Sequence, residues 1–357
     1  MSSNLDPVKS NKHVTKSQDT PKISRGDVKG RKVSQSFKKV GDSIKGLFIS
    51  LKNWINSYKI TSKKEHHVRK NEARANNHSK MIHLFHSIFS KTKKLTEKDV
   101  AERFENIEKQ TKDFIGTIKY RPTYGENKAA SRFENIQSPD HSKLEAYPSL
   151  HANNIKTENG NYIAAQVPEQ GEDVEAFWRA AASESGTIVD LTNDKDQLLV
   201  EGQNFSQEKY YPEGEGKTSK FGETTIEFMD SYEENGIIET LYNVKTGDEE
   251  SNTVKRIHYK QWPDHGVPQI DSFTTLVNKV NDLELEKPPI VHCRAGVGRT
   301  GAFIVASQVL KMKKNNTISK NDVDQLDKMV LQGRKDRDPQ FVQTEGQYQL
   351  LVNMLQK

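Results

Sequence analysis

The sequence predicts an α/β domain built on a mixed β-sheet flanked by helices, preceded by a basic, largely disordered region with short amphipathic helices. Three observations lead to this prediction. The net charge changes sign along the chain, strand-like runs alternate with helical patterns in the second part, and one apolar strand passes through a glycine-containing loop into a helix. Strands that alternate with helices are typical of a sheet covered by helices, and a hairpin signal among the strands makes that sheet mixed.

The formal net charge of +5 conceals two regions of opposite sign. Residues 1–95 contain 22 Lys and Arg against 6 Asp and Glu, whereas residues 96–357 contain 32 against 43. We therefore divide the chain into a basic N-terminal region, 1–95, and a folded domain, 96–357. Residues 1–42 hold few large apolar side chains, so they cannot bury enough surface to offset the loss of chain entropy and are expected to be disordered.

Two segments of the basic region have the spacing of amphipathic helices. Apolar side chains recur every three or four positions over residues 43–60, and residues 81–89 repeat the pattern more briefly. Such helices, with lysine on their other faces, can bind an anionic membrane surface. The same pattern suits a helix that packs on the folded domain or binds a partner such as a chaperone. No nucleic-acid-reading module accompanies the charge, so nucleic acid is not an expected partner.

Composition excludes several classes of protein. The longest apolar runs are a few residues, far short of a membrane span, and residues 1–25 lack the apolar stretch of a secretory signal peptide. The single cysteine, Cys293, precludes an intramolecular disulfide and a cysteine-based zinc cluster. Five histidines between residues 66 and 86 fit either a metal site or, more simply, a solvated linker.

Strand and helix patterns follow one another through the folded domain. Thr96 and Asp99 have the spacing of a capping box ahead of a helix over 97–114. Asn235–Gly236 is a strong signal for a two-residue hairpin turn. Strands are expected at residues 162–167, 187–191, 225–228, 237–244, 254–259 and 289–291, and further helices at 300–313, 320–331 and 344–356.

The segment from Pro288 to Leu310 carries the strongest chemical signal. An apolar strand ends at Cys293, a loop with Gly296 and Gly298 follows, and a helix begins near Arg299. Main-chain N–H groups of such a loop, with the helix N-terminus, can bind the oxygens of a phosphoryl group. Cys293 then lies among donors and positive charge, which favours the reactive thiolate. Arg299 is placed to hold two phosphate oxygens with its planar guanidinium.

HCRAGVGRTG, residues 292–301, resembles the signature loop of the cysteine-dependent protein tyrosine phosphatases, and the resemblance extends over about residues 96–357. It implies a highly twisted mixed sheet, a cysteinyl-phosphate intermediate and no cofactor or metal, because Arg299 and backbone dipoles supply the positive charge. Cys293 is the implied nucleophile, and the Thr300 hydroxyl steadies the departing thiolate. The other loop residues implied in catalysis or phosphate binding are His292, Arg294, Ala295, Gly296, Val297 and Gly298.

Three further motifs resemble loops of this family. KQWPDHGVP, residues 260–268, resembles the mobile acid loop, which makes Asp264 the general acid and later the general base. VQTEGQYQL, residues 342–350, resembles the glutamine loop, in which Gln343 and Gln347 position the hydrolytic water. SRFENIQSPDHSKL, residues 131–144, resembles the loop that sets the depth of the phosphotyrosine pocket, with the Phe133 ring against the substrate phenyl group.

Two positions depart from the family pattern. Asn135 aligns with an aspartate that holds the backbone of the substrate peptide, so a charge-assisted hydrogen bond to the substrate is lost. Ahead of the glutamine loop, Asp338–Phe341 lacks a glycine that the family has and is one residue longer. We expect the rim of the pocket to be narrower there.

These motifs favour a tyrosine-specific phosphatase that acts on phosphotyrosine proteins. A phosphoinositide phosphatase is the first alternative, because the basic Arg294 directly follows the nucleophile. A non-catalytic phosphotyrosine binder is the second, although such proteins usually lack the cysteine, the acid or the arginine.

The setting is predicted from the leader and the loop together. A polar leader ahead of HCRAGVGRTG resembles effector phosphatases that bacterial pathogens inject into host cells. That resemblance implies a cytoplasmic site of action on host signalling, with the secretion signal and chaperone site in residues 1–95. A eukaryotic or viral cytosolic phosphatase with a basic tail is the alternative.

Overall fold

The computed structural model describes residues 94–122, 131, 133–168, 171–193, 209–263 and 266–357. The expectations for residues 1–93, including the helices over 43–60 and 81–89 and the histidine-rich stretch, lie outside the described residues. So does Asp264. The described residues all belong to one unit, 74–357.

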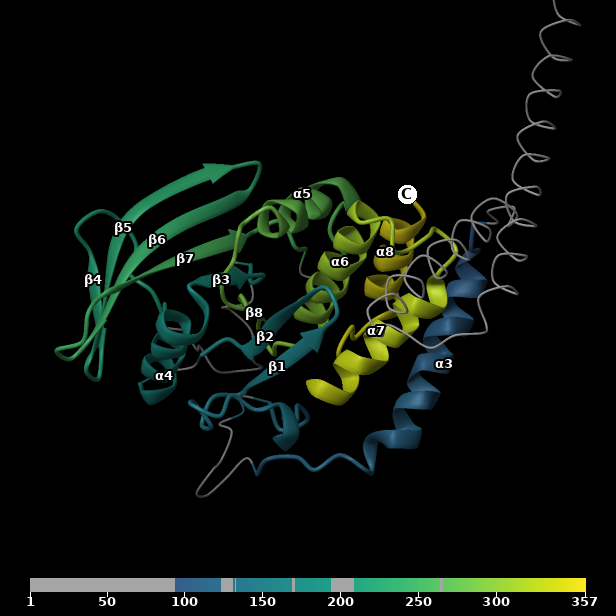
Figure 1. Cartoon of the computed structure of the whole chain (residues 1–357), viewed down its shortest axis with the longest axis horizontal. Helices are drawn as coiled ribbons and strands as arrows, with labels where there is room; N and C mark the ends of the chain where they lie inside the picture. Colours follow the sequence, from purple (N-terminus) through teal and green to yellow (C-terminus); the bar gives the residue numbers. More distant parts are fainter. Residues whose placement is uncertain (1–93, 123–130, 132, 169–170, 194–208, 264–265) are drawn as a thin grey trace, which may run out of the picture. The chain divides into compact units, whose positions relative to one another are not determined.

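In the described part of the chain, an eight-stranded mixed sheet forms the centre of the domain (Figure 1). The spatial order of its strands is β1-β2-β8-β3-β7-β6-β5-β4. Strands β2, β8, β3 and β7 run parallel, and the outer pairs are antiparallel, so the predicted mixed sheet is confirmed. The strands are β1 (Ala152–Thr157), β2 (Gly160–Gln166), β3 (Thr187–Asp190), β4 (Thr218–Phe221), β5 (Thr224–Glu234), β6 (Ile237–Thr246), β7 (Asn252–Tyr259) and β8 (Ile290–Cys293).

Local signals account for most of these strands. The predicted hairpin turn joins β5 to β6, with Asn235 and Gly236 at φ of 54° and 73°, as a two-residue turn of this type requires. The strand expected at 225–228 is longer, because β5 continues to Glu234 along β6. Strands β1 and β4 were not predicted, since neither has the alternation of a free-standing strand; each is held by pairing with its neighbour.

The predicted helices are present, and one of them is displaced along the chain. Thr96 caps the first as expected: its N–H donates to Asp99 Oδ2 at 2.8 Å, and the Asp99 N–H donates to Thr96 Oγ1 at 3.2 Å. The helix expected at 320–331 lies later in the chain, because the Ser319 N–H donates to the Asp322 carboxylate and holds a turn there. Helices α4 and α5 were not predicted. The helices are α3 (Glu97–Ile115), α4 (Glu172–Ala180), α5 (Ile270–Asn281), α6 (Gly298–Lys314), α7 (Val323–Asp336) and α8 (Glu345–Gln356), with short helical turns η1 (Asp140–Ser142) and η2 (Ala181–Ser185).

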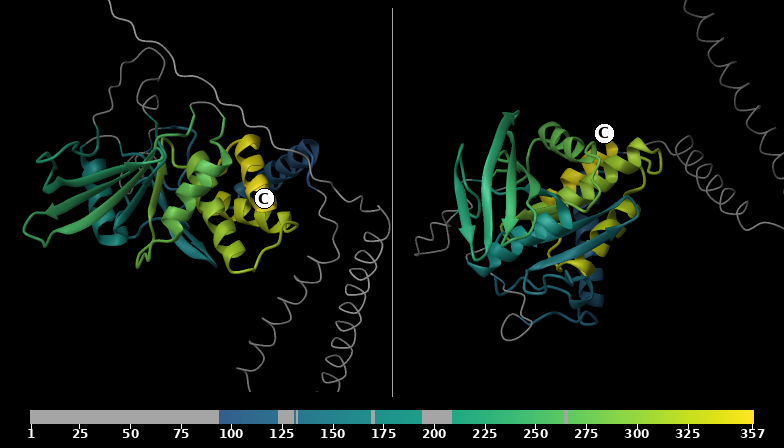
Figure 2. Two further views of the ribbon diagram at one scale, coloured as in Figure 1. Left: turned by 90° about the horizontal axis from the view of Figure 1, so that it is seen from above. Right: turned by 60° about the vertical axis from the view of Figure 1, so that its left-hand side comes forward.

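The sheet separates two apolar cores, and Figure 2 shows from two sides how the helices lie around it. Successive residues of a strand face opposite sides, so Val291 joins the core beneath the larger helical layer while Ile290 joins the core covered by α4. Helix α6 is buried on nearly all sides between the sheet and α5, α7 and α8, and α3 packs outside α7 and α8. This burial gives the loop between β8 and α6 a rigid support on both sides.

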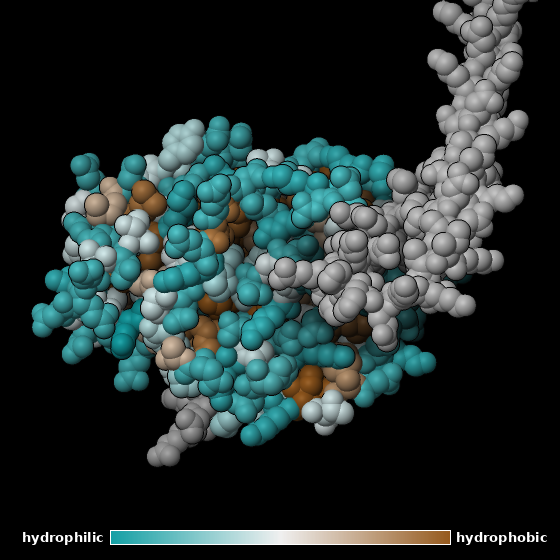
Figure 3. All heavy atoms as spheres, in the orientation of Figure 1, coloured by the Kyte–Doolittle hydropathy of each residue, from teal (hydrophilic) through white to brown (hydrophobic). Residues whose placement is uncertain are grey.

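Hydrophilic residues predominate on the face shown in Figure 3, where apolar residues form only small patches. Among the described residues, no helix is both long and apolar enough to cross a membrane.

Candidate active site

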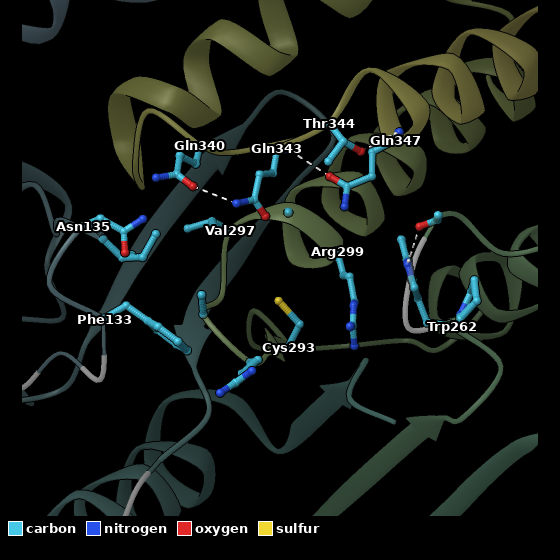
Figure 4. Close-up of a pocket in the computed structure, with 16 residues that line it drawn as sticks. Phe133, Asn135, Trp262, Cys293, Val297, Arg299, Gln340, Gln343, Thr344 and Gln347 are labelled. Atoms are coloured by element: carbon cyan, nitrogen blue, oxygen red, sulfur yellow. Dashed lines mark hydrogen bonds between the residues drawn. The ribbon is translucent and has the colours of Figure 1, made fainter. Parts of the chain in front are cut away.

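The loop between β8 and α6 lies at the carboxyl edge of the parallel strands. Cys293 ends β8, which pairs in parallel with β2 and β3, and only 5% of its surface is exposed. Helix α6 begins five residues later at Gly298, so its positive N-terminal end adjoins the loop. Cys293 opens into a hollow of about 430 Å³ (Figure 4).

Two glycines allow the loop its path. Gly296 has φ of 72°, and a Cβ there would lie 2.1 Å from the carbonyl oxygen of Ala165 in β2. A Cβ on Gly298 would lie 3.0 Å from Gln347 Nε2. The backbone of β2 therefore requires glycine at position 296, whereas at position 298 only side-chain atoms of Gln343 and Gln347 would lie so close.

Four segments that are distant in sequence line the hollow. In Figure 4, Phe133 and Asn135 lie on one side of Cys293, Trp262 lies on the other, and the glutamines lie above it. Arg294 and Arg299 are the formally charged members of the described lining, so the hollow suits a dianionic group. The lining residues are Phe133, Asn135, Ile136, Trp262, Pro263, Gly266, Cys293, Arg294, Ala295, Val297, Gly298, Arg299, Gln340, Gln343, Thr344 and Gln347.

Both loop arginines are oriented by protein contacts. Arg299 Nη1 donates to the carbonyl oxygen of Leu191 at 3.1 Å, directly after β3. The guanidinium carbon of Arg294 lies 5.4 Å from the centre of the Phe133 ring, a cation–π distance. Arg294 and Phe133 therefore form one wall of the hollow together.

The flanks of the acid loop are anchored beside the hollow. Asn193 Nδ2 donates to the Trp262 carbonyl at 2.9 Å, and Trp262 Nε1 donates to the Gly266 carbonyl at 3.3 Å. The Trp262 ring packs edge-on against Phe273 at 5.2 Å between centroids. Asp264, the predicted acid, lies between these anchors in the sequence but outside the described residues.

The glutamine segment is held by its own side chains. The Gln343 N–H donates to Gln347 Oε1 at 2.8 Å, and Gln343 Nε2 donates to Gln340 Oε1 at 2.7 Å. Val342, just before it, has φ of 56°, a strained conformation for a β-branched residue. The buried Val342 side chain holds this conformation and so places Gln343 at the hollow.

The segment Asp338–Phe341, one residue longer than in the family pattern, connects two turns at the rim of the hollow. The sequence did not predict this connection. The Asp338 carboxylate accepts the N–H groups of Gln137 and Gln340, each at 2.7 Å. It thereby joins the turn that bears Phe133 to the turn that brings Gln340 into the lining. Burial raises the pKa of Asp338, against the two N–H groups and nearby Arg337, which lower it.

Arg337 supports the loop from beneath, a role that no motif in the sequence predicted. It is fully buried, and it donates to the carbonyl oxygens of Gly296 at 3.0 Å and Ala295 at 3.2 Å on the underside of the loop. It also donates to Asn153 Oδ1 and to His151 Nδ1, each at 2.9 Å. Burial lowers the pKa of Arg337 to about 10, so it remains cationic at neutral pH.

A second buried group lies behind the loop. His292 Nε2 is 2.7 Å from the Tyr210 hydroxyl, and Asp190 accepts hydrogen bonds from Arg256. Burial lowers the pKa of His292, although Asp190 opposes this effect. For Asp190, the sequence predicted only a strand over residues 187–191. The sequence did contain one signal for this buried group. Asp190 is a charged residue inside an otherwise apolar strand, and a buried charge requires a buried partner.

The remaining predicted residues lie beneath or beside the hollow. Thr300 and His292 are buried and do not line it, and neither does Gly296. Within the described residues, the buried Oγ1 of Thr300 has no hydrogen-bond partner. No group of three or more potential metal ligands occurs in the described part of the chain.

The sequence of this chain is similar to those of known proteins. A family model described as protein-tyrosine phosphatase matches residues 127–357. The receptor-type tyrosine-protein phosphatase eta of Gallus gallus is 30% identical over 294 residues, which cover 76% of this chain and 20% of that protein. The tyrosine-protein phosphatase Lar-like of Caenorhabditis elegans is 33% identical over 210 residues, 54% of this chain and 9% of that protein. The chain therefore spans at most about a fifth of these two relatives.

Solved structures share the fold. The Trypanosoma cruzi protein tyrosine phosphatase TcPTP1 superimposes with a TM-score of 0.62 at 22% identity, covering 72% of this chain and 91% of that chain. The catalytic domain of human protein tyrosine phosphatase non-receptor type 18 gives 0.61 at 23% identity, covering 72% and 95%. With the family match spanning most of the folded domain, the chain belongs to the protein-tyrosine phosphatase family.

Proposed function

We propose that this protein hydrolyses phosphotyrosine in proteins through a cysteinyl-phosphate intermediate. The observation that carries the proposal is the cationic hollow in which Cys293, Arg299 and two glutamines meet beside an aromatic wall. A phosphotyrosine presents a dianionic phosphate to the arginine and a phenyl ring to Phe133, so both halves of the substrate find a matching surface.

The reaction takes two displacements at phosphorus. The Cys293 thiolate attacks in line, the bond from phosphorus to the tyrosyl oxygen breaks, and Asp264 gives its proton to the departing oxygen. Water placed by Gln343 and Gln347 then attacks phosphorus while Asp264 takes a proton from it. The sulfur–phosphorus bond breaks, and inorganic phosphate and the Cys293 thiolate are released.

Charge stabilisation in both steps comes from the loop. Arg299 and the N–H groups from Arg294 to Arg299 hold the three equatorial oxygens, and the N-terminus of α6 adds its partial positive charge. The Thr300 hydroxyl, without a described partner, is available to steady the thiolate. His292 supports Cys293 from behind.

The test is turnover by the full-length protein in the presence of a chelator. A phosphotyrosine peptide, the matching phosphoserine peptide and a soluble phosphoinositide are compared, with Cys293→Ser and Asp264→Asn as controls. We expect hydrolysis of phosphotyrosine alone, abolished by Cys293→Ser and lowered at least about 100-fold by Asp264→Asn. Tight phosphopeptide binding without turnover of any substrate would instead identify a phosphotyrosine binder.

A phosphoinositide phosphatase is the second candidate, favoured by one observation. Arg294 adds a second cation to the lining beside Arg299, which suits a substrate with more than one phosphate. Arg294→Ser separates the two functions. It would lower turnover of a bisphosphorylated inositol much more than turnover of a phosphotyrosine peptide if the lipid is the substrate, and both equally otherwise.

We also propose that residues 1–95 and 96–357 are separate functional units of an effector that bacteria deliver into the host cytoplasm. The reversal of net charge between the two regions supports the division. Residues 43–60 and 81–89 would contact a membrane surface or a chaperone. Fusing residues 1–95 to a reporter, and measuring delivery and binding to anionic against neutral vesicles, tests these roles. A reporter that is neither delivered nor bound contradicts them.

A further inference from the structure

A buried ion pair lies directly behind the loop and takes no part in the proposed chemistry. Asp190 and Arg256 belong to the neighbouring parallel strands β3 and β7 and are 0% and 3% exposed. Arg256 donates to Asp190 Oδ2 through Nε at 3.0 Å and through Nη2 at 2.5 Å. Replacing such a pair by apolar side chains is often neutral for stability, so stability alone does not explain its presence.

The second carboxylate oxygen of Asp190 holds the turn that follows β3. Oδ1 accepts the N–H of Thr192 at 2.9 Å and the Thr192 hydroxyl at 2.6 Å. Leu191 lies between these two residues, and its N–H donates to the carbonyl of His292 at 2.9 Å. Its carbonyl oxygen accepts Arg299 Nη1 at 3.1 Å. The Asp190 carboxylate therefore fixes the turn whose Leu191 carbonyl accepts a hydrogen bond from Arg299.

The same carboxylate is linked to the residue before the nucleophile. The Tyr210 hydroxyl lies 3.3 Å from Asp190 Oδ2 and 2.7 Å from His292 Nε2, and Arg256 Nε is 3.3 Å from that hydroxyl. On the other side, His258 Nε2 is 2.9 Å from the Thr192 carbonyl. Asp190 is thus linked to both sides of the site: to His292, which precedes Cys293, and to the turn that contacts Arg299.

We propose that Asp190, paired with Arg256, is a positioning residue that aims the Arg299 guanidinium at the substrate phosphate. This inference rests on the proposed phosphatase function. A guanidinium binds two phosphate oxygens well only when its plane is correctly oriented. The Leu191 carbonyl fixes one of its nitrogens, and Asp190 fixes that carbonyl through the Thr192 turn. Asp190 itself touches neither the substrate nor the reacting atoms.

Two double variants separate positioning from folding. Asp190→Asn with Arg256→Gln removes both charges but keeps an oxygen that can accept from Thr192. Asp190→Leu with Arg256→Met removes that acceptor as well. We expect both proteins to unfold near the midpoint of the unaltered chain. The first should keep kcat/KM within about threefold, and the second should lose about tenfold or more, as for a misplaced charge-assisted hydrogen bond.

A binding cycle tests whether the effect acts through Arg299. In Cys293→Ser protein, phosphotyrosine-peptide binding is measured by calorimetry with and without the apolar pair, each in Arg299 and Arg299→Ala backgrounds. We expect the pair to weaken binding only where Arg299 is present. Equal weakening in both backgrounds overturns the proposal, as does full kcat/KM in a stable apolar variant.

The controls keep the two hypotheses apart. No turnover of phosphotyrosine by the unaltered protein contradicts the proposed function, whereas normal turnover with insensitive variants contradicts only the positioning role. If the apolar pair does not fold, Thr192→Val loosens the same turn from a half-buried position. It should lower kcat/KM about threefold, the cost of one weak hydrogen bond, and an unchanged value overturns the proposal.

Discussion

Single residues of the loop tolerate little change because protein atoms surround them closely. Gly296 adopts a positive φ against the backbone of β2, and Gly298 adjoins the glutamine side chains. Asn135 differs, since it is exposed at the edge of the hollow. The glycine positions therefore govern whether the site forms, whereas Asn135 governs which substrates the site prefers.

Gly296→Ala should inactivate the enzyme and destabilise the fold. The new Cβ would overlap the Ala165 carbonyl oxygen, and φ of 72° is strained for alanine by about 1–3 kcal/mol. Phosphotyrosine turnover and thermal unfolding measure the two effects. Gly116→Ala is the matched control, because its φ of −68° suits alanine and no atom lies within 4 Å. Normal activity in Gly296→Ala would contradict the close packing of the loop.

Asn135→Asp should improve binding of peptide substrates. A carboxylate at this exposed position would restore a charge-assisted hydrogen bond to the substrate backbone, worth about 1.5–3 kcal/mol when fully formed. We expect KM for a phosphotyrosine peptide to fall several-fold at unchanged kcat. KM for p-nitrophenyl phosphate, which has no peptide backbone, should stay the same. An equal change for both substrates would place Asn135 in contact with the phosphate instead.

At the scale of elements, the site depends on side chains that join separate segments. Arg337, just after α7, links the loop after β8 to the start of β1. Asp338 links the Phe133 turn to Gln340. Asp190 and Arg256 join β3 to β7. Each of these buried charged groups thus connects strands or turns whose own local sequences form them independently.

Arg337→Met should destabilise the domain by about 3 kcal/mol, because it leaves the Gly296 and Ala295 carbonyls without their buried donor and removes one of the two donors to Asn153 Oδ1. Urea unfolding measures the loss. Lys328→Met, at an exposed position of α7, is the control and should change stability by less than about 0.5 kcal/mol. Equal stability of both variants would show that the loop does not need the brace.

At the scale of the whole molecule, the domain buries several ionisable groups whose protonation differs between the folded and unfolded states. Burial lowers the pKa of three histidines, His151, His258 and His292, so the folded domain holds them neutral. Burial raises the pKa of Asp327 and Asp338, which act in the opposite direction at more acidic pH. The histidines therefore determine how the stability of the domain changes with pH just below neutrality.

Stability should fall as the pH is lowered from 7.5 to 5.5. An unfolded histidine takes up a proton near pH 6.5, whereas the buried ones do not, so acid favours the unfolded state by up to about 1.4 kcal/mol per pH unit for each proton. Urea unfolding at several pH values measures the slope. A flat or inverted slope would contradict neutral buried histidines.

One repeated sequence shows how context selects structure. Phe-Glu-Asn-Ile occurs at 104–107 inside α3 and again at 133–136 in a turn. Both isoleucines are buried, Ile107 against the helical layer and Ile136 beside the hollow. In the second copy, the Ser131 hydroxyl donates to the Phe133 carbonyl at 2.7 Å, and that carbonyl also accepts the Ile136 N–H at 3.1 Å. The same four residues therefore form helix or turn according to their neighbours.

Local features of this protein could be predicted from its amino-acid sequence. The Cys293 loop, the cap at Thr96, the turn at Asn235–Gly236 and the amphipathic helix α3 all depend on residues close together in the chain. Their conformations follow from backbone sterics and from apolar periodicity, which any short segment carries within itself.

The contacts between distant side chains could not be predicted, because they arise only when the whole domain folds. The Arg337 brace, the Asp190–Arg256 pair and the Asp338 link each connect segments separated by tens to hundreds of residues. A buried charge or amide is tolerated only where its partner arrives in three dimensions. No local pattern in the sequence specifies that partner, because it depends on how the sheet and helices pack together.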